Sequence, residues 1–337
     1  MKAVVCTALG DPSVLKLLDW PSRTPGEGEV RIALFGGGVN FADLLVISGR
    51  YQENWTPPFV LGTEGAGIVV ECAPGVTNVK LGDRVVIQNN IGRACYAEEI
   101  TIPAYRVTTV PHQVRLCDIA GLPINFGTSY YALVNRANLQ PGEVVVVHGA
   151  SGGVGLAAVQ IAKMLGAVVI ATGGDDGKLA LVREEGADFT INYKTQSFRE
   201  KVLELTDGRG ADVYYDPVGG DVFDESLRAI AENGRILVIG FTSGRIPAAP
   251  ANRILFKGIS VVGAPHGRFS KGDPVAWAKM MQTLLDLVRV GKLKPRIHQR
   301  FPLSEASTAL RLIEKREVVG KCILMTERGF AEERSGR

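Results

Sequence analysis

The chain has 337 residues, 46% of them hydrophobic, and a formal net charge of +3 from 38 basic and 35 acidic residues. This length predicts two domains of about 100–200 residues each, and the balanced charge excludes an electrostatic surface for nucleic acid. Every apolar run is interrupted by glycine or charge well before ~18 residues, so we expect no membrane span.

Residues 1–125 consist of short strand-like runs separated by proline and glycine. The runs lie at 30–34, 65–72, 84–87 and 96–102. Their spacing predicts an irregular antiparallel β domain.

From residue 126 to residue 264 the pattern changes to alternating strands and helices. The candidate strands lie at 144–147, 168–172, 189–192, 213–216, 236–240 and 259–263. With helices between them, these strands predict an α/β fold with a doubly wound parallel sheet of the Rossmann type.

The remaining segment, residues 265–337, combines both element types. We expect a helix at 273–290, a strand at 297–301, a helix at 304–314 and a strand at 321–325. The tail from Glu327 onward is polar, and we expect it to be mobile.

The cysteines indicate the redox environment. They are scattered at positions 6, 72, 95, 117 and 322. This pattern predicts reduced thiols, without a disulfide framework or a Cys-x-x-Cys metal knuckle. The start MKAVVCTAL lacks the charged and apolar regions of a secretory signal, so we expect a cytoplasmic protein.

The stretch from Glu143 to Lys163 carries the strongest functional signal. The valines at 144–147 predict a buried strand, glycines mark the turn at 149, 152 and 155, and an amphipathic helix is expected over 156–165. Glycines there permit a tight turn and the approach of a pyrophosphate to backbone N–H groups at the positive end of the helix. The alternative is a plain strand-to-helix turn, but the combined pattern favours a dinucleotide site.

The sequence of this turn, GASGGVG, resembles the cofactor turn of the quinone oxidoreductase branch of the medium-chain dehydrogenases/reductases. This branch is zinc-free and includes zeta-crystallin. The resemblance extends from Met1 to about Met325. It implies a Rossmann cofactor-binding domain at 126–264 and a discontinuous catalytic domain, a GroES-like irregular β-barrel, at 1–125 and 265–337. It also implies a homodimer that pairs the edge strand Gly258 to Gly263 across subunits; a tetramer is not excluded.

Zinc-binding relatives in this superfamily carry a cysteine and a histidine that are replaced here. Asn40 stands where the cysteine would fall, and Thr63 stands where the histidine would fall. Neither an amide nor a hydroxyl is a good zinc ligand. His148 ends a predicted strand and is expected to be a packed neutral imidazole. The other histidines are isolated in the sequence: His112, His266 and His298. We therefore expect no metal.

The resemblance implies several cofactor contacts. Gly152, Gly153 and Val154 would offer backbone groups to the pyrophosphate, and Thr128 would lie on the nicotinamide side. Val218 and Phe241 follow predicted strands, at the carboxyl edge where ligands bind in open α/β sheets.

The choice between the two nicotinamide cofactors depends on the residues after the second Rossmann strand. Gly174 stands where an NAD site usually carries an acidic residue, so the pocket would be open to a 2′-phosphate, and Lys178 would supply a positive charge. Tyr193 and Arg316 resemble further phosphate contacts of the family. Each residue has a structural alternative: Lys178 as a solvated helix residue, Tyr193 as a core aromatic and Arg316 as a surface charge.

NADPH is the cofactor that this pattern favours. NADH stays open because Asp175 and Asp176 follow directly, and a carboxylate turned toward the ribose would repel a phosphate.

With no metal expected, no Ser-His-Asp order and no reactive cysteine motif, the remaining chemistry is direct hydride transfer to an already electrophilic acceptor, a quinone or an enone. By resemblance, Asn40 would hydrogen-bond the nicotinamide ribose or the substrate, and Tyr51 would line the pocket and donate to the acceptor oxygen. The alternatives are that Asn40 is a turn residue and that Tyr51 is a core aromatic. Asp43 is expected to bond loop backbone, and the glycines at 36–38 are expected to leave room near the nicotinamide ring.

Two other functions fit the same motifs. The first is a cofactor-binding protein with little turnover, because a fold alone does not fix function. The second is an enoyl-CoA-type reductase, which would need a basic entrance for the CoA phosphates; the candidates are Arg245, Arg253 and Arg268.

Overall fold

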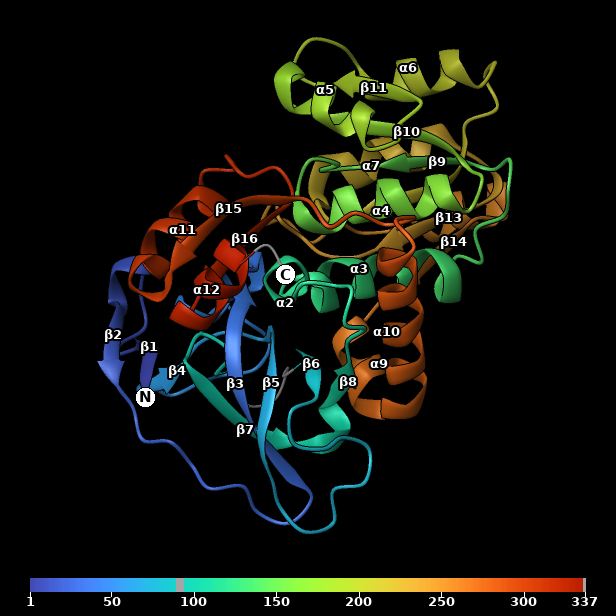
Figure 1. Cartoon of the computed structure of the whole chain (residues 1–337). Helices are drawn as coiled ribbons and strands as arrows, with labels where there is room; N and C mark the ends of the chain where they lie inside the picture. The colour runs from blue at the N-terminus through green and yellow to red at the C-terminus, as the bar shows by residue number, and fades with distance from the viewer. Residues whose placement is uncertain (89–93, 336–337) are drawn as a thin grey trace. The chain divides into compact units, whose positions relative to one another are not determined.

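The structure is a computed structural model that describes residues 1–88 and 94–335 (Figure 1). Contacts within the chain divide it into two compact units, residues 1–124 with 269–337 and residues 125–268. Helix α3 (Leu122–Tyr130) carries the chain from the first unit into the second.

The second unit is built on a parallel sheet with the strand order β11-β10-β9-β12-β13-β14. Its strands are β9 (Val144–Val147), β10 (Val168–Gly173), β11 (Phe189–Asn192), β12 (Ala211–Asp216), β13 (Ile230–Val238) and β14 (Ser260–Gly263). All neighbouring strands pair in parallel. The valines of β9 are largely or fully buried at the centre, as a β-branched run in a parallel sheet should be. The predicted doubly wound α/β fold is confirmed.

Helices connect these strands, as crossovers in a parallel sheet require. They are α4 (Gly153–Met164), α5 (Asp176–Glu184), α6 (Phe198–Leu205), α7 (Gly220–Ala229) and α8 (Ala251–Lys257). The π-helical turn η3 (Tyr131–Arg136) precedes the sheet, and α9 (His266–Gly272) follows it. The largest difference from the predicted strand bounds is in β13, which begins at Ile230 rather than 236 and ends at Val238. The Asn-Gly pair at 233–234 reads as a turn in the sequence, but the strand continues through it, with Asn233 at φ 60° and a register shift against β12.

The first unit contains two sheets. Among its described residues, the larger has the order β15-β16-β3-β5-β6-β8, with β7 also pairing β3, and the smaller has the order β2-β1-β4. The strands are β1 (Lys2–Cys6), β2 (Leu15–Asp19), β3 (Glu29–Gly38), β4 (Phe59–Val60), β5 (Glu64–Cys72), β6 (Arg84–Gln88), β7 (Glu99–Pro103), β8 (Val107–Thr109), β15 (Ile297–Pro302) and β16 (Lys321–Met325). The pairs are antiparallel except β15 with β16.

Short helices complete this unit. They are η1 (Pro12–Val14), α1 (Phe41–Ile47), η2 (Ala104–Arg106), α2 (Leu116–Ile119), α10 (Pro274–Arg289), η4 (Leu303–Glu305), α11 (Ala306–Glu314) and α12 (Glu327–Ser335). Strand β7 starts at Glu99 rather than at 96, because Tyr96 leaves the ladder: its N–H donates to Leu61 O and its carbonyl accepts from Val4 N.

The C-terminal strand β16 completes the sheet that begins near the N-terminus. It pairs antiparallel with the glycine end of β3, with Ile323 opposite Gly38 and Met325 opposite Gly36. The last part of the chain therefore belongs to the same unit as the first.

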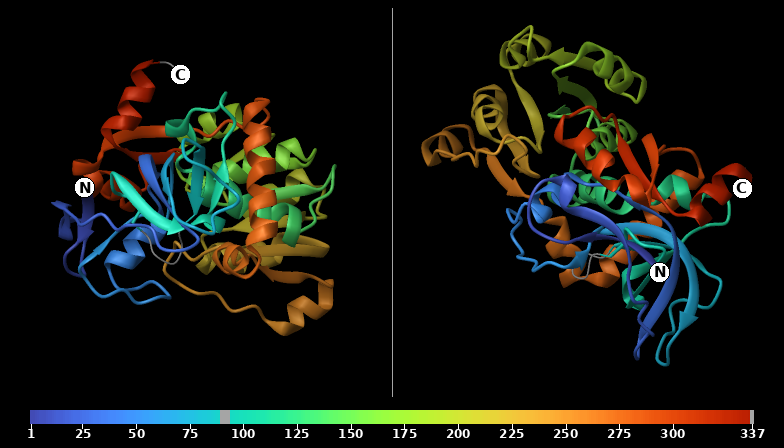
Figure 2. Two further views of the ribbon diagram at one scale, coloured as in Figure 1. Left: turned by 60° about the horizontal axis from the view of Figure 1, so that its bottom comes forward. Right: turned by 90° about the vertical axis from the view of Figure 1, so that its left-hand side faces the viewer.

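The expectation of a mobile tail is wrong for residues 327–335, and residues 336 and 337 lie outside those that the structure describes. Residues 327–335 form α12, the red helix at the C-terminus in Figures 1 and 2. The carboxylate of Glu332 accepts hydrogen bonds from the N–H groups of Leu116 and Cys117, at the start of α2, and pairs with Arg84 at 3.0 Å. A polar sequence was read as solvated, but one of its charges caps another helix.

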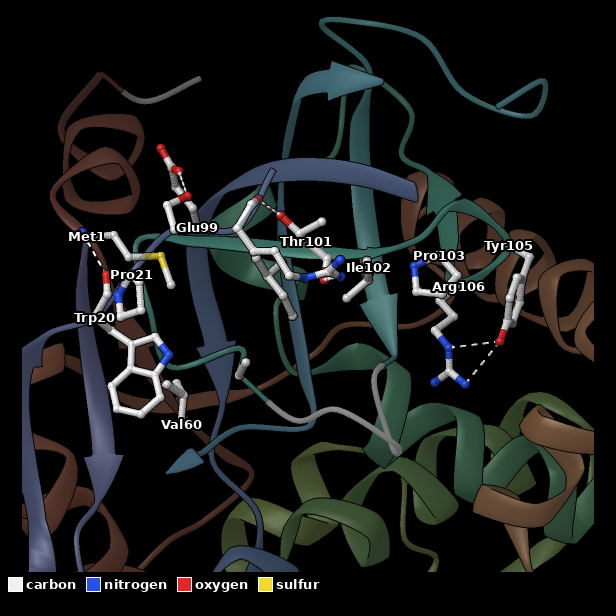
Figure 3. Close-up of a pocket in the computed structure, with 14 residues that line it drawn as sticks. Met1, Trp20, Pro21, Val60, Glu99, Thr101, Ile102, Pro103, Tyr105 and Arg106 are labelled. Atoms are coloured by element: carbon white, nitrogen blue, oxygen red, sulfur yellow. Dashed lines mark hydrogen bonds between the residues drawn. The ribbon is translucent and has the colours of Figure 1, made fainter. Parts of the chain in front are cut away.

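A pocket of about 480 Å³ lies in the first unit against β7. Figure 3 shows Trp20 and Tyr105 at opposite ends of it, with Arg106 beside the tyrosine hydroxyl at 3.3 Å. No helix within residues 1–88 and 94–335 is both long and apolar enough to cross a membrane. All five cysteines are free thiols, of which only Cys72 is exposed.

Candidate functional site

The glycine turn after β9 brings a helix close to a strand. Gly149 has φ 57°, in the left-handed region that favours glycine. A Cβ added at Gly155 would overlap the Gly149 carbonyl oxygen, so only glycine allows this approach. Helix α4 begins at Gly153, three residues before the predicted start, so Gly153 and Val154 lie in its first turn. The N–H groups of such a turn have no partner within the helix and can face an anion.

The ends of β10 and β11 bring Gly174 and Tyr193 into contact. A Cβ added at Gly174 would lie 2.8 Å from the phenol oxygen of Tyr193, whose side chain is 46% exposed. Lys178 lies half-buried in the first turn of α5. Three predicted residues therefore belong to one edge of the second unit.

Both aspartates that left NADH open have partners within the second unit. The Asp175 carboxylate accepts a hydrogen bond from Lys178 N at 2.9 Å and caps α5. The Asp176 carboxylate accepts from the amide of Asn192 at 2.8 Å. Each carboxylate therefore already has one partner within the protein.

The loops after β12 and β13 are tied to each other. Asp216 accepts hydrogen bonds from the N–H groups of Val218 and Gly219 at 2.8 and 2.9 Å, and burial raises the pKa of its carboxyl group. Thr242 N donates to Pro217 O at 3.1 Å. A Cβ at Gly219 would lie 3.0 Å from the ring of Phe241. Val218 and Phe241 thus lie in adjoining loops at the carboxyl edge of the sheet.

Thr128 has an aromatic partner that the sequence did not indicate. Its hydroxyl lies 3.4 Å from Nδ1 of His266, a side chain only 5% exposed. Burial lowers the pKa of His266 to about 4, so the ring is neutral at pH 7. His266, isolated in the sequence, thus has a partner in the structure.

His148 is the packed neutral imidazole that was expected. Its two ring nitrogens lie 2.9 Å from the hydroxyls of Thr172 and Ser226, and burial lowers its pKa to about 3. Within the described parts of the chain, no group of three or more His, Cys, Asp or Glu side chains is arranged to hold a metal ion.

In the first unit, Asn40 belongs to a buried polar cluster with Glu64 and Lys321. Its Nδ2 donates to Glu64 Oε1 at 2.8 Å and to Gly38 O at 3.1 Å, and its Oδ1 accepts from the Lys321 ammonium at 2.6 Å. Lys321 also pairs with Glu64 at 2.6 Å, with side chains 7% and 0% exposed. The second oxygen of Glu64 accepts from Ile124 N at 2.7 Å. We call this group the Asn40 cluster.

Asp43 supports the loop that carries Asn40. Its carboxylate accepts from Asn40 N at 2.8 Å and from the Tyr96 hydroxyl at 2.6 Å. The expected bond to loop backbone is thus present. Burial, with Asp43 beside it, raises the pKa of Tyr96 well above its usual value, so the phenol stays protonated and donates.

The expectation that Gly36 to Gly38 leave open room is wrong. A Cβ at Gly36 would lie 2.9 Å from Leu324 O, and one at Gly37 would lie 2.8 Å from Cys95 O. A Cβ at Gly38 would lie 2.5 Å from Glu64 Oε1 and 2.8 Å from Lys321 Cε. Neighbouring backbone and the Asn40 cluster already fill that space.

The other two predicted residues of the first unit have different surroundings. Tyr51 is partly buried and packs against a core cluster that includes Leu44 and Phe59. Arg316 is exposed and follows α11 with φ 58°. Their predicted contacts with a ligand stay predictions.

Sequence reasoning missed Lys321 and Glu64 as functional candidates. Lys321 was read as the first residue of a strand, and Glu64 only as the neighbour of Thr63. The available signal was a charged residue opening an otherwise apolar strand, KCILM, together with three consecutive glycines elsewhere.

Comparisons with known proteins agree with this architecture. A family model described as alcohol dehydrogenase GroES-like domain matches residues 26–133, and one described as zinc-binding dehydrogenase matches residues 153–286. The quinone oxidoreductase-like protein 2 homolog of Nematostella vectensis is 41% identical over 328 residues, covering 97% of this chain and 89% of that protein. The quinone oxidoreductase of Pseudomonas aeruginosa is 33% identical, covering 96% and 99%. The crystal structure of Escherichia coli quinone oxidoreductase complexed with NADPH has a TM-score of 0.90 at 29% identity, covering 97% and 100%.

Proposed function

The chain belongs to the zinc-free quinone oxidoreductase branch of the medium-chain dehydrogenase/reductase superfamily, and from that premise we propose that it is an NADPH-dependent reductase of quinones or α,β-unsaturated carbonyls that needs no metal ion. The observation that carries the proposal is the contact of Gly174 with Tyr193 at the end of the second Rossmann strand, with Lys178 in the first turn of the helix that follows. This edge offers a 2′-phosphate a phenol and an ammonium, and the two nearby carboxylates each already accept a hydrogen bond from the protein.

The hydrogen bonds that Asp175 and Asp176 accept support NADPH over NADH. Each carboxylate already accepts a hydrogen bond within the second unit, from Lys178 N and from Asn192. The relative from Escherichia coli was solved with NADPH, which favours the same cofactor here.

The residues at the zinc position of relatives do not fit a zinc ion. Asn40 Oδ1 and Glu64 Oε1 both contact the Lys321 ammonium at 2.6 Å, so a divalent cation there would face a fixed positive charge. Thr63, in place of a histidine, is buried and offers only a hydroxyl. We therefore propose metal-independent hydride transfer.

In this mechanism the bound nicotinamide supplies the hydride, and the protein supplies orientation and a dry environment. The glycine turn and the first turn of α4 bind the pyrophosphate, with Gly152, Gly153 and Val154 offering backbone groups. Val218 and Phe241 would contact the bound cofactor, and Thr128 would contact it on the nicotinamide side. Asn40 and Tyr51 carry the proposed catalytic contacts in a domain formed by residues 1–125 and 265–337; residues 126–264 form the cofactor domain.

Two alternatives carry their own tests. An enoyl-CoA-type reductase needs a basic entrance, but the guanidinium of its candidate Arg245 already pairs with Asp221 and Asp224. A cofactor-binding protein with little turnover would bind NADPH, but none of the acceptors would oxidise the bound NADPH.

The discriminating experiment is a plate or stopped-flow assay of NADPH and NADH oxidation with 1,4-benzoquinone, 9,10-phenanthrenequinone and crotonyl-CoA. We expect both quinones to be reduced with NADPH. Reduction of crotonyl-CoA alone would favour the enoyl-CoA reading, and tight NADPH binding without oxidation by any acceptor would favour the binding protein. One tightly bound zinc per purified chain would contradict the metal-free mechanism.

The cofactor assignment has a matched pair of variants on α5. Lys178→Ala should raise the KM for NADPH about tenfold and leave that for NADH unchanged, because one charge-assisted hydrogen bond contributes about 1.5 kcal/mol. Arg183→Ala, on the same helix beside Thr190, should change neither. Equal effects of Lys178→Ala on both cofactors would contradict the phosphate contact.

We also propose a homodimer that pairs β14 across subunits. This strand lies at the edge of the sheet, and Leu255 and Phe256 before it are 84% and 90% exposed. Unpaired edges and exposed aromatic residues are usually covered. Phe256→Ser should lower the sedimentation mass toward that of one chain; a monomeric parent protein would contradict the dimer.

A further inference from the structure

We infer that Lys321 and Glu64 are positioning residues that hold the Asn40 carboxamide in one orientation, in which Asn40 meets its ligand only as a hydrogen-bond acceptor. The inference rests on the proposed function, because the ligand concerned is the nicotinamide cofactor. It goes further by deciding between the two roles that the sequence left open for Asn40.

The orientation follows from the chemistry of the two neighbours. A lysine ammonium has only donors, and an ionised glutamate has only acceptors. Lys321 Nζ lies 2.6 Å from Asn40 Oδ1, and Glu64 Oε1 lies 2.8 Å from Asn40 Nδ2. Rotating the amide by 180° would turn its NH₂ group toward the ammonium and its oxygen toward the carboxylate. The charges on either side therefore select one of the two orientations.

The remaining capacity of Asn40 can then be counted. A carboxamide has two N–H donors and two acceptor lone pairs. Glu64 and the Gly38 carbonyl use both donors, and Lys321 uses one lone pair. The Asp43 N–H faces the same side chain in the capping box of α1, but it donates to the Asn40 main-chain carbonyl at 3.0 Å. One acceptor position of the side chain is therefore left, on a residue that is 7% exposed.

The cluster is built to hold Lys321 in place. A Cβ at Gly121 would lie 2.6 Å from both Cγ and Cε of Lys321. Gly38, at the end of β3, faces the same lysine side chain. These two glycines leave a slot that the lysine stem fills. The Lys321–Glu64 pair therefore has little freedom to swing away from the amide.

An acceptor pairs with a hydroxyl and not with a carbonyl oxygen. The oxygen of a quinone or enone is itself an acceptor, so Asn40 cannot stabilise the charge that develops on it. A ribose hydroxyl of the nicotinamide half of the cofactor can donate to Asn40. Asn40 thus positions the hydride donor, and a different group or solvent must supply the proton to the acceptor.

The test measures binding as well as turnover. The proteins are the parent, Asn40→Ala, and the paired variant Lys321→Met with Glu64→Gln, which removes both charges together because a lone buried carboxylate would unfold the unit. The probes are NADPH and adenosine 2′,5′-bisphosphate, which lacks the nicotinamide ribose. Lys163→Met with Asp188→Asn, a partly exposed lysine–carboxylate pair of the second unit at 2.5 Å, is the control.

We expect the Kd for NADPH to rise about tenfold in Asn40→Ala and in the paired variant, since one hydrogen bond to a positioned partner is lost. The Kd for the bisphosphate should stay within about twofold, and the control should change neither. The KM for NADPH should rise while the KM for the quinone stays constant. An unchanged NADPH Kd in the paired variant would overturn the inference, as would a rise in the quinone KM alone.

A second measurement does not depend on the charge variants. An NADPH analogue whose nicotinamide sugar lacks its hydroxyls should bind the parent protein about tenfold more weakly than NADPH, but Asn40→Ala should bind both equally. Equal binding of the two cofactors by the parent would overturn the acceptor role. A parent that binds neither NADPH nor the bisphosphate would instead contradict the proposed function.

Discussion

Glycine serves opposite purposes in the two units. In the second unit Gly149 and Gly155 bring backbone against backbone, so that a helix begins close to the end of a strand. In the first unit Gly38 and Gly121 make room for two charged side chains inside the fold. The comparison teaches that a run of glycines in a sequence does not by itself indicate open space, because a buried lysine can occupy it.

Replacing one glycine in each unit should have the largest effects. Equal effects of the two substitutions would contradict the difference between the units. In Gly155→Ala the new methyl group meets the Gly149 carbonyl, which cannot move without the strand, so we expect a loss of about 3 kcal/mol in stability and of NADPH binding. Gly38→Ala meets the side chains of Lys321 and Glu64, and should disturb the Asn40 cluster while adenosine 2′,5′-bisphosphate still binds.

Chemical denaturation and titration calorimetry would measure both changes. Gly272→Ala, with open space around it, is the control and should be nearly neutral. Loss of bisphosphate binding in Gly38→Ala would show that the two glycines do not act on separate units.

Acid should destabilise the second unit more than the first. His148 and His266 are buried there with pKa values lowered to about 3 and about 4, whereas His112 and His298 of the first unit are exposed. Once unfolded, each buried ring binds a proton near pH 6.5. The contribution of each ring to the free energy of unfolding is therefore complete above pH 6.5. It is lost as the pH falls toward the pKa of the folded state, and the loss at pH 5 is about 2 kcal/mol per ring.

The sequence provides separate reporters for this test. Its three tryptophans, at 20, 55 and 277, all lie in the first unit, so their fluorescence follows that unit. Hydrogen exchange of peptides from 125–268 follows the second. His148→Gln should reduce the loss of protection between pH 7 and pH 5, and His112→Gln should not. Equal acid sensitivity of both reporters would contradict the difference between the units.

The smallest expected effect concerns the C-terminal helix of the first unit. Glu332→Ala removes the partner of Arg84 and of two N–H groups of α2, and should cost about 2 kcal/mol in the unfolding of that unit, seen by tryptophan fluorescence. Glu327→Ala, on the exposed side of α12, should stay within about 0.5 kcal/mol. If α12 contributed nothing to stability, both substitutions would change the free energy of unfolding by the same negligible amount.

The same difference explains which elements the sequence predicted. The strands at 144–147, 189–192 and 321–325 agree with β9, β11 and β16 to the residue, because their signal is local: short apolar runs bounded by turn residues or charge. Helix α12 was missed because its stability comes from Arg84 and α2, more than 200 positions away in the chain.

The candidate site divides in the same way. Gly152, Gly174 and Val218 could be predicted from their positions after strands, since a parallel sheet places all such turns at one edge. The Asn40 cluster could not, because nothing near residue 40 indicates a lysine at 321. Asn40 could be singled out because it stands where zinc-binding relatives carry a cysteine, but its contact with Lys321 depends on the pairing of β16 with β3.

That pairing also sets an order of events during synthesis. Strand β3 can pair with β5 and β7 as soon as these have left the ribosome, but β16 follows the whole of residues 125–268. Until then the glycine end of β3 lacks its neighbour, and the carboxylate of Glu64 lacks its counter-ion. The Asn40 cluster is therefore among the last parts of the molecule to form, and a nascent chain cannot acquire it before almost all of the polypeptide exists.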